Sequence, residues 1–323
     1  MTKQPLTILC GMPRSGTTWL GKIFDSHPDT LYLHEPDSVM HIKDLPLVTT
    51  VDQGQIYRLQ IASFVEHLRT INSTKVNGSL PIFPKHYYNP LQFGWKKCNI
   101  YLAKIGARVM GEFPVIDLLG KKKHSNLRLV WKSIESVGRL GLFARTIPDV
   151  RIIMALRHPC GYVSSVLRGE QKRKFTGDAP TSEDYGLMEI LLGTKSARER
   201  GLNLDEMKKL LAVERLAWQW LLFNENTIAE LKEQRNCKII RYEDLCEAPQ
   251  NTVRQLFSFT GLDWQQQTAH FLAASIATEN ESYYSVYKNP QQAAYRWREA
   301  LSGQDIDRIL KIVRGSLPGD FYD

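Results

Sequence analysis

The sequence predicts an α/β fold of three layers, in which helices flank a central, mostly parallel sheet of about five strands. Short apolar runs alternate with longer stretches of helical periodicity, which is the pattern of parallel strands joined by crossover helices. A glycine-rich turn follows the first apolar run, and basic residues follow most of the others. We expect one domain over residues 1–323, with long substrate-side insertions near 45–125 and 168–215.

The expected strands are five short apolar runs, at residues 6–10, 30–33, 127–132, 150–156 and 237–242. Residues 17–27 follow the first run with apolar side chains at helical spacing, so we expect a helix there. The stretch before the third strand has irregular patterning and many aromatic residues. Its aromatic segment, residues 83–95, either stacks on a sugar or phenol ring of a ligand or forms a small core of the insertion. The charged segment 168–186 is expected to be loop-like.

Charge and cysteine content narrow the class of protein. The net charge is +8, and its basic residues are scattered along the chain, which favours a small anionic ligand over nucleic acid. Five cysteines without a C-x-x-C pair or zinc spacing predict free thiols in a reducing compartment and no metal site. The sequence shows no signal peptide and no stretch that could span a bilayer. We therefore expect a cytoplasmic location.

The first turn, "GMPRSGTT" at 11–18, fits most of the phosphate-binding pattern G-x-x-x-x-G-K-[ST]. Thr17 stands where that pattern has lysine, and the nearby cation is Arg14. Small residues let backbone N–H groups curl around phosphate oxygens, and the following helix adds its dipole. Thr17 and Thr18 offer hydroxyl donors, and Arg14 offers a bidentate charged contact. A plain strand-turn-helix is the alternative.

Ligands of open parallel sheets bind at the carboxyl ends of the strands. The remaining expected strands end at His34-Glu35, at Lys132, at Arg157 and near Arg241, so the sheet edge gathers cations beside one carboxylate. A helix is expected to start at Pro159, and a serine on it could bind a second phosphate together with Arg157. Taken alone, this second motif fits an ordinary strand-helix connection equally well.

Both motifs together resemble the sulfotransferases that use 3′-phosphoadenosine 5′-phosphosulfate (PAPS), a family with a P-loop-type fold. "PRSGTTWL" (13–20) is similar to the family's loop for the 5′-phosphosulfate, and "RHPCGYVSSVLR" (157–168) to its 3′-phosphate motif. "IIRYEDLCEAP" (239–249) and "YRWREALSGQDIDRIL" (295–310) resemble further blocks, the latter from the carbohydrate-type group. Arg14 replaces the lysine of the cytosolic members and points to the carbohydrate-type and bacterial subgroup.

The resemblance implies roles for individual residues. The loop residues would bind the 5′ end of the co-substrate: Arg14, Ser15, Gly16, Thr17, Thr18 and Trp19. Arg157 and Ser165 would bind the 3′-phosphate, while His158, Ser164 and Arg168 are expected to be structural. The resemblance alone suggests that Trp297 and Arg298 close over the co-substrate.

The expected reaction passes a sulfuryl group from PAPS to a hydroxyl or amine by in-line displacement, without a metal. Positioned cations and a general base suit this chemistry. The catalytic candidates are Arg14, Lys132, and Glu35 as the base; His34 is the rival base. Strand alternation predicts that His34 and Glu35 point to opposite faces. The structural alternatives are a Glu35 that pairs with Arg14 and a Lys132 that lies in solvent.

Two other functions share these features. A P-loop kinase or nucleotide hydrolase would need Mg²⁺ and the missing lysine. A binding module would keep the phosphoanion pocket without catalysis. The acceptor is expected to be a carbohydrate, a glycolipid or a small molecule, and the chain is a candidate homo-oligomer.

Overall fold

The computed structural model describes residues 5–110, 127–172, 179–277 and 289–323. Its centre is a sheet of five strands, namely β1 (Leu6–Cys10), β2 (Thr30–His34), β3 (Arg128–Ser133), β4 (Arg151–Leu156) and β5 (Cys237–Arg241). The strands lie in the order β2-β3-β1-β4-β5, and every neighbouring pair is parallel. The predicted α/β fold is confirmed, and each expected strand is found to within one residue at both ends.

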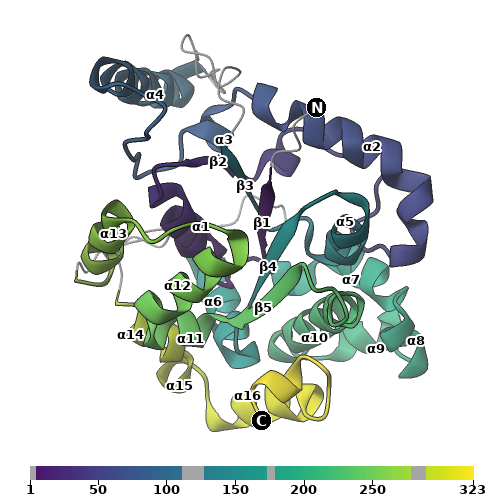
Figure 1. The fold of residues 1–323 in the computed structure, drawn as a ribbon. Coiled ribbons are helices and arrows are strands. Elements are labelled where there is room, and N and C mark those ends of the chain that lie inside the picture. Colours follow the sequence, from purple (N-terminus) through teal and green to yellow (C-terminus); the bar gives the residue numbers. More distant parts are fainter. Residues whose placement is uncertain (1–4, 111–126, 173–178, 278–288) are drawn as a thin grey trace.

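The sheet is buried on both faces because neighbouring residues of each strand enter different cores. Ile8 and Ile152 belong to one apolar cluster, whereas Leu9 and Ile153 belong to the other. Continuous apolar runs are therefore required in these strands, in place of an alternation of apolar and polar residues. Helices cover each face, which gives three layers (Figure 1).

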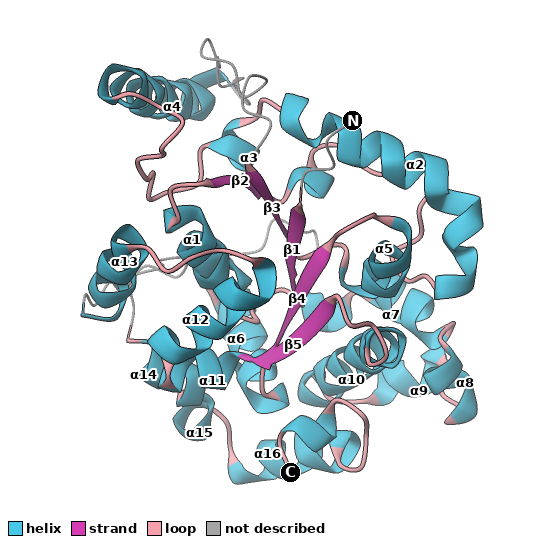
Figure 2. Cartoon of the chain, viewed as in Figure 1, coloured by secondary structure: helices cyan, strands magenta, loops and turns pink. Residues whose placement is uncertain are grey.

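The first layer covers the Leu9 face and consists of α1 (Thr17–Ser26), α11 (Tyr242–Glu247), α12 (Pro249–Thr260) and α13 (Gln266–Ala277). The second layer covers the Ile8 face and consists of α2 (Gly54–His67), α5 (Leu140–Thr146), α6 (Pro159–Gln171), α10 (Ala212–Leu231) and α16 (Gly303–Val313). Figure 2 shows α1, α12 and α13 on one side of the strands and α2, α5 and α10 on the other.

Shorter helices and one long helix complete the described chain: α3 (Thr74–Asn77), α4 (Pro90–Met110), α7 (Tyr185–Leu192), α8 (Lys195–Glu199), α9 (Leu204–Lys209), α14 (Pro290–Tyr295) and α15 (Trp297–Ala300). The 3₁₀ turns include η1 (Pro36–Ser38), η2 (Val51–Gln53), η3 (Leu68–Thr70), η5 (Val137–Arg139), η6 (Thr181–Glu183) and η7 (Gly319–Phe321). At the edge of the molecule, α4 packs on α3 (Figure 1).

The insertions are more regular than the sequence predicts. The expected irregular stretch 45–125 contains α2, α3 and α4, although residues 111–126 lie outside the described part. α4 escaped recognition because it has apolar residues on two opposite faces and therefore no single amphipathic stripe. The segment 168–186 is not simply loop-like, because α6 continues to Gln171 and α7 begins at Tyr185. Residues 173–178 of this segment lie outside the described part.

Candidate active site

The loop between β1 and α1 is curled by two left-handed residues. Arg14 has φ 74° and Gly16 has φ 85°. Ser15 closes the turn, since its N–H and its Oγ donate to the Met12 oxygen at 3.1 and 2.6 Å. A Cβ on Gly16 would collide with the Tyr242 ring. Glycine is therefore required at 16 by both its conformation and its neighbour.

The N-terminus of α1 points its free N–H groups at this loop. The first N–H groups of a helix lack intrahelical acceptors, and no side chain caps α1. Thr17 is buried and Thr18 is partly exposed. A helix N-terminus with open donors and a positive dipole end is a site for an anion. The loop has the geometry expected of a phosphate cradle.

The structure brings the two predicted phosphate motifs into contact. Nε of Arg14 donates to Oγ of Ser165 at 3.1 Å, and Nη1 of Arg157 donates to the main-chain oxygen of Arg14 at 2.7 Å. Arg157 also donates from Nη2 to the Ala293 oxygen at 2.8 Å, and its guanidinium lies over the Tyr242 ring. The loop cation thus faces the second motif, so both predicted phosphate sites share one cationic wall.

These contacts lie where the order of the strands in the sheet reverses. From β1 the chain continues to β2 on one side of the sheet, and from β4 it continues to β5 on the other side. Arg14 follows β1 and Arg157 follows β4, which are neighbours. This switch point is the place where open α/β sheets bind ligands.

The ends of β2 and β3 bring together a carboxylate and a buried lysine. Nζ of Lys132 donates to Oε1 of Glu35, and the Lys132 side chain is only 1% exposed. The alternative of a lysine in solvent is therefore wrong. Burial raises the pKa of Glu35, but nearby positive charge, that of Lys132 first, outweighs this effect, so the net pKa lies below its ordinary value. The carboxylate is consequently ionised at neutral pH.

His34 lies beside Glu35, and the prediction that the two side chains point to opposite faces is wrong. Nε2 of His34 is 3.8 Å from Oε1 of Glu35. The reason is the backbone of Glu35, whose φ of 51° is left-handed and ends the strand alternation at His34. Both candidate bases therefore reach the same space.

The environment of His34 keeps its imidazole ring neutral. Burial, with a contribution from Lys132, lowers the pKa of His34 to about 3, so its ring is neutral at neutral pH. Tyr32 keeps its phenolic proton because burial raises the pKa of this group well above its ordinary value. The Tyr32 hydroxyl lies 2.8 Å from Nδ1 of His34 and forms a hydrogen bond with it. A ring with a pKa of about 3 is a weak proton acceptor, whereas the Glu35 carboxylate is ionised, which favours Glu35 as the base.

Two residues of this region were missed by sequence reasoning. Nζ of Lys75 lies 3.9 Å from Oε2 of Glu35, and its side chain is 45% exposed. Asp37 is buried and accepts hydrogen bonds from Trp131, Ser133 and Ser136, which hold the turn after Glu35 on β3. No local signal marks Lys75, because the path of the insertion brings it to the sheet. The "HEPD" segment contained Asp37, two residues after Glu35.

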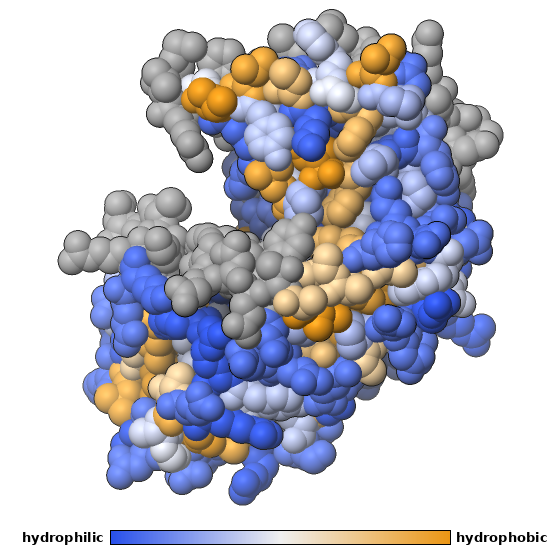
Figure 3. Space-filling view, turned by 90° about the vertical axis from the view of Figure 1, so that its left-hand side faces the viewer, coloured by the Kyte–Doolittle hydropathy of each residue, from blue (hydrophilic) through white to orange (hydrophobic). Residues whose placement is uncertain are grey.

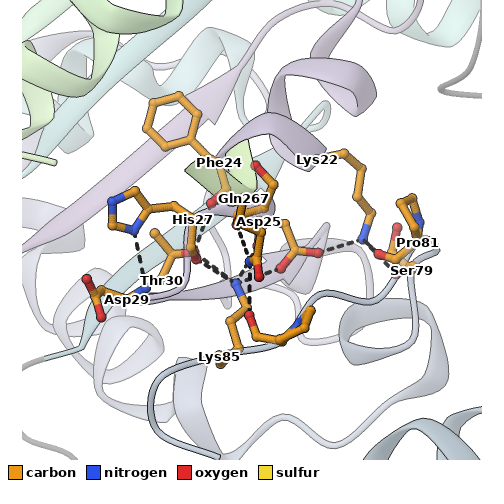
Figure 4. Close-up of polar contacts among 12 residues, drawn as sticks. Lys22, Phe24, Asp25, His27, Asp29, Thr30, Ser79, Pro81, Lys85 and Gln267 are labelled. Atoms are coloured by element: carbon orange, nitrogen blue, oxygen red, sulfur yellow. Dashed lines mark hydrogen bonds and ion pairs between the residues drawn. The ribbon is translucent and has the colours of Figure 1, made fainter. Parts of the chain in front are cut away.

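A buried lysine cluster fixes the insertion on α1 (Figure 4). Nζ of Lys22 donates to Asp25 at 2.7 Å and to the main-chain oxygens of Ser79 and Pro81 at 2.6 and 3.0 Å. Lys85 reaches in the opposite direction and donates to the main-chain oxygens of Asp25 and His27. Lys22 thus holds the chain directly after α3, the helix that carries Lys75.

Residues 5–266 match the sulfotransferase family. The chain belongs to this family. Carbohydrate sulfotransferase 1 of Mus musculus is 20% identical over 338 residues, which cover 94% of this chain and 75% of the mouse protein. Carbohydrate sulfotransferase 5 of Homo sapiens is 23% identical over 332 residues, covering 94% and 74%. Among solved structures, the sulfotransferase domain from the curacin biosynthetic pathway superimposes with a TM-score of 0.48 at 14% identity, covering 96% of this chain and 98% of that domain.

The other residues named from the sequence pack against neighbouring elements of this sulfotransferase. Trp19 is buried in the α1 layer, and its Nε1 donates to Ser275 at 3.1 Å, so its side chain packs in the core. Trp297 is also buried and stacks on His158, with ring centroids 4.5 Å apart. The His158 side chain caps α6 by accepting from Cys160 N–H. His158 is therefore structural, as predicted.

Arg298 packs on an aromatic ring, and the aromatic segment 83–95 is partly packed and partly exposed. Arg298 lies over the ring of Tyr295, with its guanidinium carbon 4.6 Å from the ring centroid. In the aromatic segment, Phe83 packs edge-to-face on Phe271, whereas Trp95 on α4 is 52% exposed. The segment is thus only partly a core, and α4 carries its exposed end.

All five cysteines of the sulfotransferase are free thiols. Within the described ranges, no group of three or more His, Cys, Asp or Glu side chains could hold a metal ion. No helix in the described part of the chain has the length and apolar composition needed to cross a bilayer.

Proposed function

We propose that this sulfotransferase transfers the sulfuryl group of PAPS to a hydroxyl or amine of an acceptor, with Glu35 as general base. The contact between Arg14 and Ser165, completed by the bond from Arg157 to the Arg14 oxygen, is the observation that carries this proposal. It joins the cradle after β1 to a second cationic group at the switch point. A ligand with phosphates at both its 5′ and 3′ positions needs two such groups side by side.

The residues present suit that co-substrate. The curled loop and the open N-terminus of α1 would hold the 5′-phosphosulfate through main-chain N–H groups and the Thr17 and Thr18 hydroxyls. Arg157 and Ser165 would hold the 3′-phosphate, and Arg14 lies between the two. Arg157 keeps N–H groups for a ligand, because a guanidinium carries five and Arg157 uses two for the Arg14 and Ala293 oxygens.

In the reaction, the acceptor oxygen or nitrogen forms a bond to sulfur while the bond from sulfur to the bridging phosphate oxygen breaks. The electron pair of that bond leaves with 3′-phosphoadenosine 5′-phosphate (PAP), and the acceptor proton passes to Glu35. Arg14 and the α1 N–H groups would stabilise the charge that develops on the leaving phosphate. Lys132 keeps the Glu35 carboxylate ionised and adds positive charge beside the transferred group.

The acceptor side lies at Glu35 and Lys75. The similarity to carbohydrate sulfotransferases 1 and 5 supports a carbohydrate or glycolipid acceptor over other hydroxyl compounds. The cytoplasmic location, the single domain over 1–323 and the homo-oligomer stay predictions.

Thermal stability in the presence of ligands tests the co-substrate directly. PAP at about a hundred times its dissociation constant adds roughly 2.7 kcal/mol to the folded state and raises the melting temperature by about 4 °C. ATP, with or without Mg²⁺, is expected to give a smaller rise. A rise with Mg-ATP alone would replace this function with that of a kinase or nucleotide hydrolase.

Product formation separates an enzyme from a binding module. Incubation with PAPS and a panel of sugars, glycolipids and small alcohols is expected to release PAP and to add the mass of one sulfuryl group to an acceptor. Strong PAP binding without product from any acceptor class, or from water, would favour a pocket without catalysis.

A further inference from the structure

The helix α4 has apolar side chains on two opposite sides. Its inner side faces the body: Ile100 and Ala103 are buried, and the missing Cβ of Gly78 makes room for Ile100. Its outer side carries four large apolar residues whose exposed fractions lie between 52 and 86%, namely Leu91, Trp95, Leu102 and Ile105. Cys98 between them is exposed as well. We call these five residues the outer stripe.

The outer stripe is continuous along the helix. Its members are spaced alternately four and three residues apart, so they fall within an arc of about 80° on the helix circumference. Ile100 lies on the opposite side of that circumference. A helix with apolar residues on both sides is normally covered on both sides, but the described part of the chain leaves the outer stripe of α4 exposed. In Figure 3, hydrophobic side chains gather along the upper part of the face, where α4 lies.

The charges of α4 indicate what covers the outer stripe. The helix contains no Asp or Glu, whereas Lys97 and Lys104 lie on one side of it, about 120–140° around the circumference from the centre of the stripe. Lys97 is exposed and Lys104 is partly exposed. A second copy of this helix would bring like charges together, and the whole chain has a net charge of +8. A negatively charged surface complements this helix, and a lipid bilayer also accepts its apolar stripe.

We propose that α4 lies in the interface of an anionic membrane. The outer stripe would enter the boundary between headgroups and acyl chains, and Lys97 and Lys104 would contact lipid phosphates. Trp95 suits this depth, because an indole ring combines an apolar body with a polar N–H. The helix lies on the bilayer in this arrangement and does not cross it. The inference requires neither the co-substrate nor sulfuryl transfer, so it stands apart from the proposed function.

The test is flotation of the whole chain with lipid vesicles. Binding is expected to vesicles of phosphatidylcholine containing about 30% phosphatidylglycerol, and to be at least about tenfold weaker for phosphatidylcholine alone. The double variant Trp95→Ser/Leu102→Ser should bind at least about tenfold more weakly. Lys97→Glu/Lys104→Glu should lose about as much and should remove most of the salt dependence. The matched control is Ile56→Ser/Leu59→Ser on α2, whose residues are 65 and 81% exposed and whose binding should stay within about twofold.

Three results would overturn the proposal: equal loss in the α2 control, full binding by both α4 variants, or no preference for anionic vesicles. A wild-type dimer that Trp95→Ser/Leu102→Ser turns into a monomer, without vesicle binding, would assign the stripe to a second copy. Should the serine variant unfold, the lysine variant and the salt series decide the question. Sulfuryl transfer to a soluble acceptor is expected to be unchanged in Lys97→Glu/Lys104→Glu, which separates failure of this inference from failure of the proposed function.

Discussion

Nη1 of Arg157 donates to the main-chain oxygen of Arg14 at 2.7 Å, across a sequence separation of 143 residues. This bond ties the loop after β1 to the end of β4, and Arg157 is buried while it does so. Arg157 therefore has a structural role in addition to its proposed contact with the 3′-phosphate. Replacing Arg157 would disturb both, so a second residue is needed to measure the phosphate contact alone.

Ser165→Ala provides that measurement. The hydroxyl accepts from Arg14 and is buried, and its loss should weaken PAP binding by about 10–100-fold, as for a hydrogen bond to a charged group. Adenosine 5′-phosphosulfate lacks the 3′-phosphate and should bind nearly as before. Calorimetry with both ligands checks this difference. Ser164→Ala, on the same helix, is the control and should leave both affinities within about twofold. Equal losses for the two ligands would remove Ser165 from the 3′-phosphate site.

Glu35→Gln is expected to lower kcat by about 10²–10⁴-fold, because Gln cannot take the acceptor proton. The melting-temperature rise with PAP should persist, since the cradle is intact. His34→Gln should lose less than about tenfold, because burial lowers the pKa of His34 to about 3 and its neutral ring is a weak proton acceptor. An active Glu35→Gln enzyme beside an inactive His34→Gln enzyme would reverse the assignment. Both assays should be run below the melting temperature of each variant. Glu35 pairs with the buried Lys132, so its replacement lowers the stability of the fold.

The pH profile depends on the Glu35–Lys132 pair. The pKa of Glu35 lies below its ordinary value of 4.5, so the base is ionised above that pH and activity is lost only as the pH falls through the lowered pKa. We expect no acid limb from Glu35 between about pH 5.5 and 8 in the wild-type enzyme. In Lys132→Gln, burial acts without its main counterweight, and the acid limb should move up by about one pH unit or more. Measuring kcat/KM from about pH 4 to about pH 9 checks this shift. An unchanged acid limb would show that Lys132 does not lower the pKa of the base.

Gly16→Ala is expected to destabilise the loop through backbone strain and through a collision of the new Cβ with the Tyr242 ring. A substitution at a second glycine measures the backbone strain alone. Gly201 has φ 66° and open space around it, so Gly201→Ala should cost only the backbone strain of about 1–2 kcal/mol. At Gly16 the new Cβ also meets the Tyr242 ring, which should add about 1–3 kcal/mol. Urea denaturation of both variants gives the difference. Equal losses would show that the Tyr242 ring yields freely.

Lys22→Met tests the anchor of the insertion. The substitution leaves the Ser79 and Pro81 oxygens without their donor and removes one partner of Asp25. We expect a loss of about 3–5 kcal/mol and faster proteolysis between residues 70 and 90. Lys195→Met, at a side chain 84% exposed, should cost less than about 0.5 kcal/mol. If Lys22→Met kept both its stability and its resistance to protease, the cluster would not hold the insertion.

The strands were predictable because both faces of the sheet are buried. A run such as residues 150–156 must then be apolar throughout, and that pattern marks its ends closely. The positions of the loop after β1 and of the helix after β4 were predictable because their sequence signals are local. Their contact through Arg14 and Ser165 was not expected, since it depends on the left-handed backbone at Arg14.

Other features were hidden for physical reasons. The side-by-side placement of His34 and Glu35 follows from a single positive φ, which no strand pattern encodes. Lys22 sits among the apolar residues of α1, and its acceptors lie 57 and 59 residues further along the chain. Lys75 reaches Glu35 only because the insertion is fixed at Lys22. Such long-range contacts leave no local periodicity.

Lys22 and Lys85 hold the insertion largely through main-chain oxygens, which are present whatever the side chains are. The anchor therefore depends on the path of the chain and hardly on its composition. Side chains between residues 79 and 84 can be exchanged without loss of these bonds, provided that the path is kept. This stretch can thus vary in sequence while the chain between α3 and α4 keeps its place on α1.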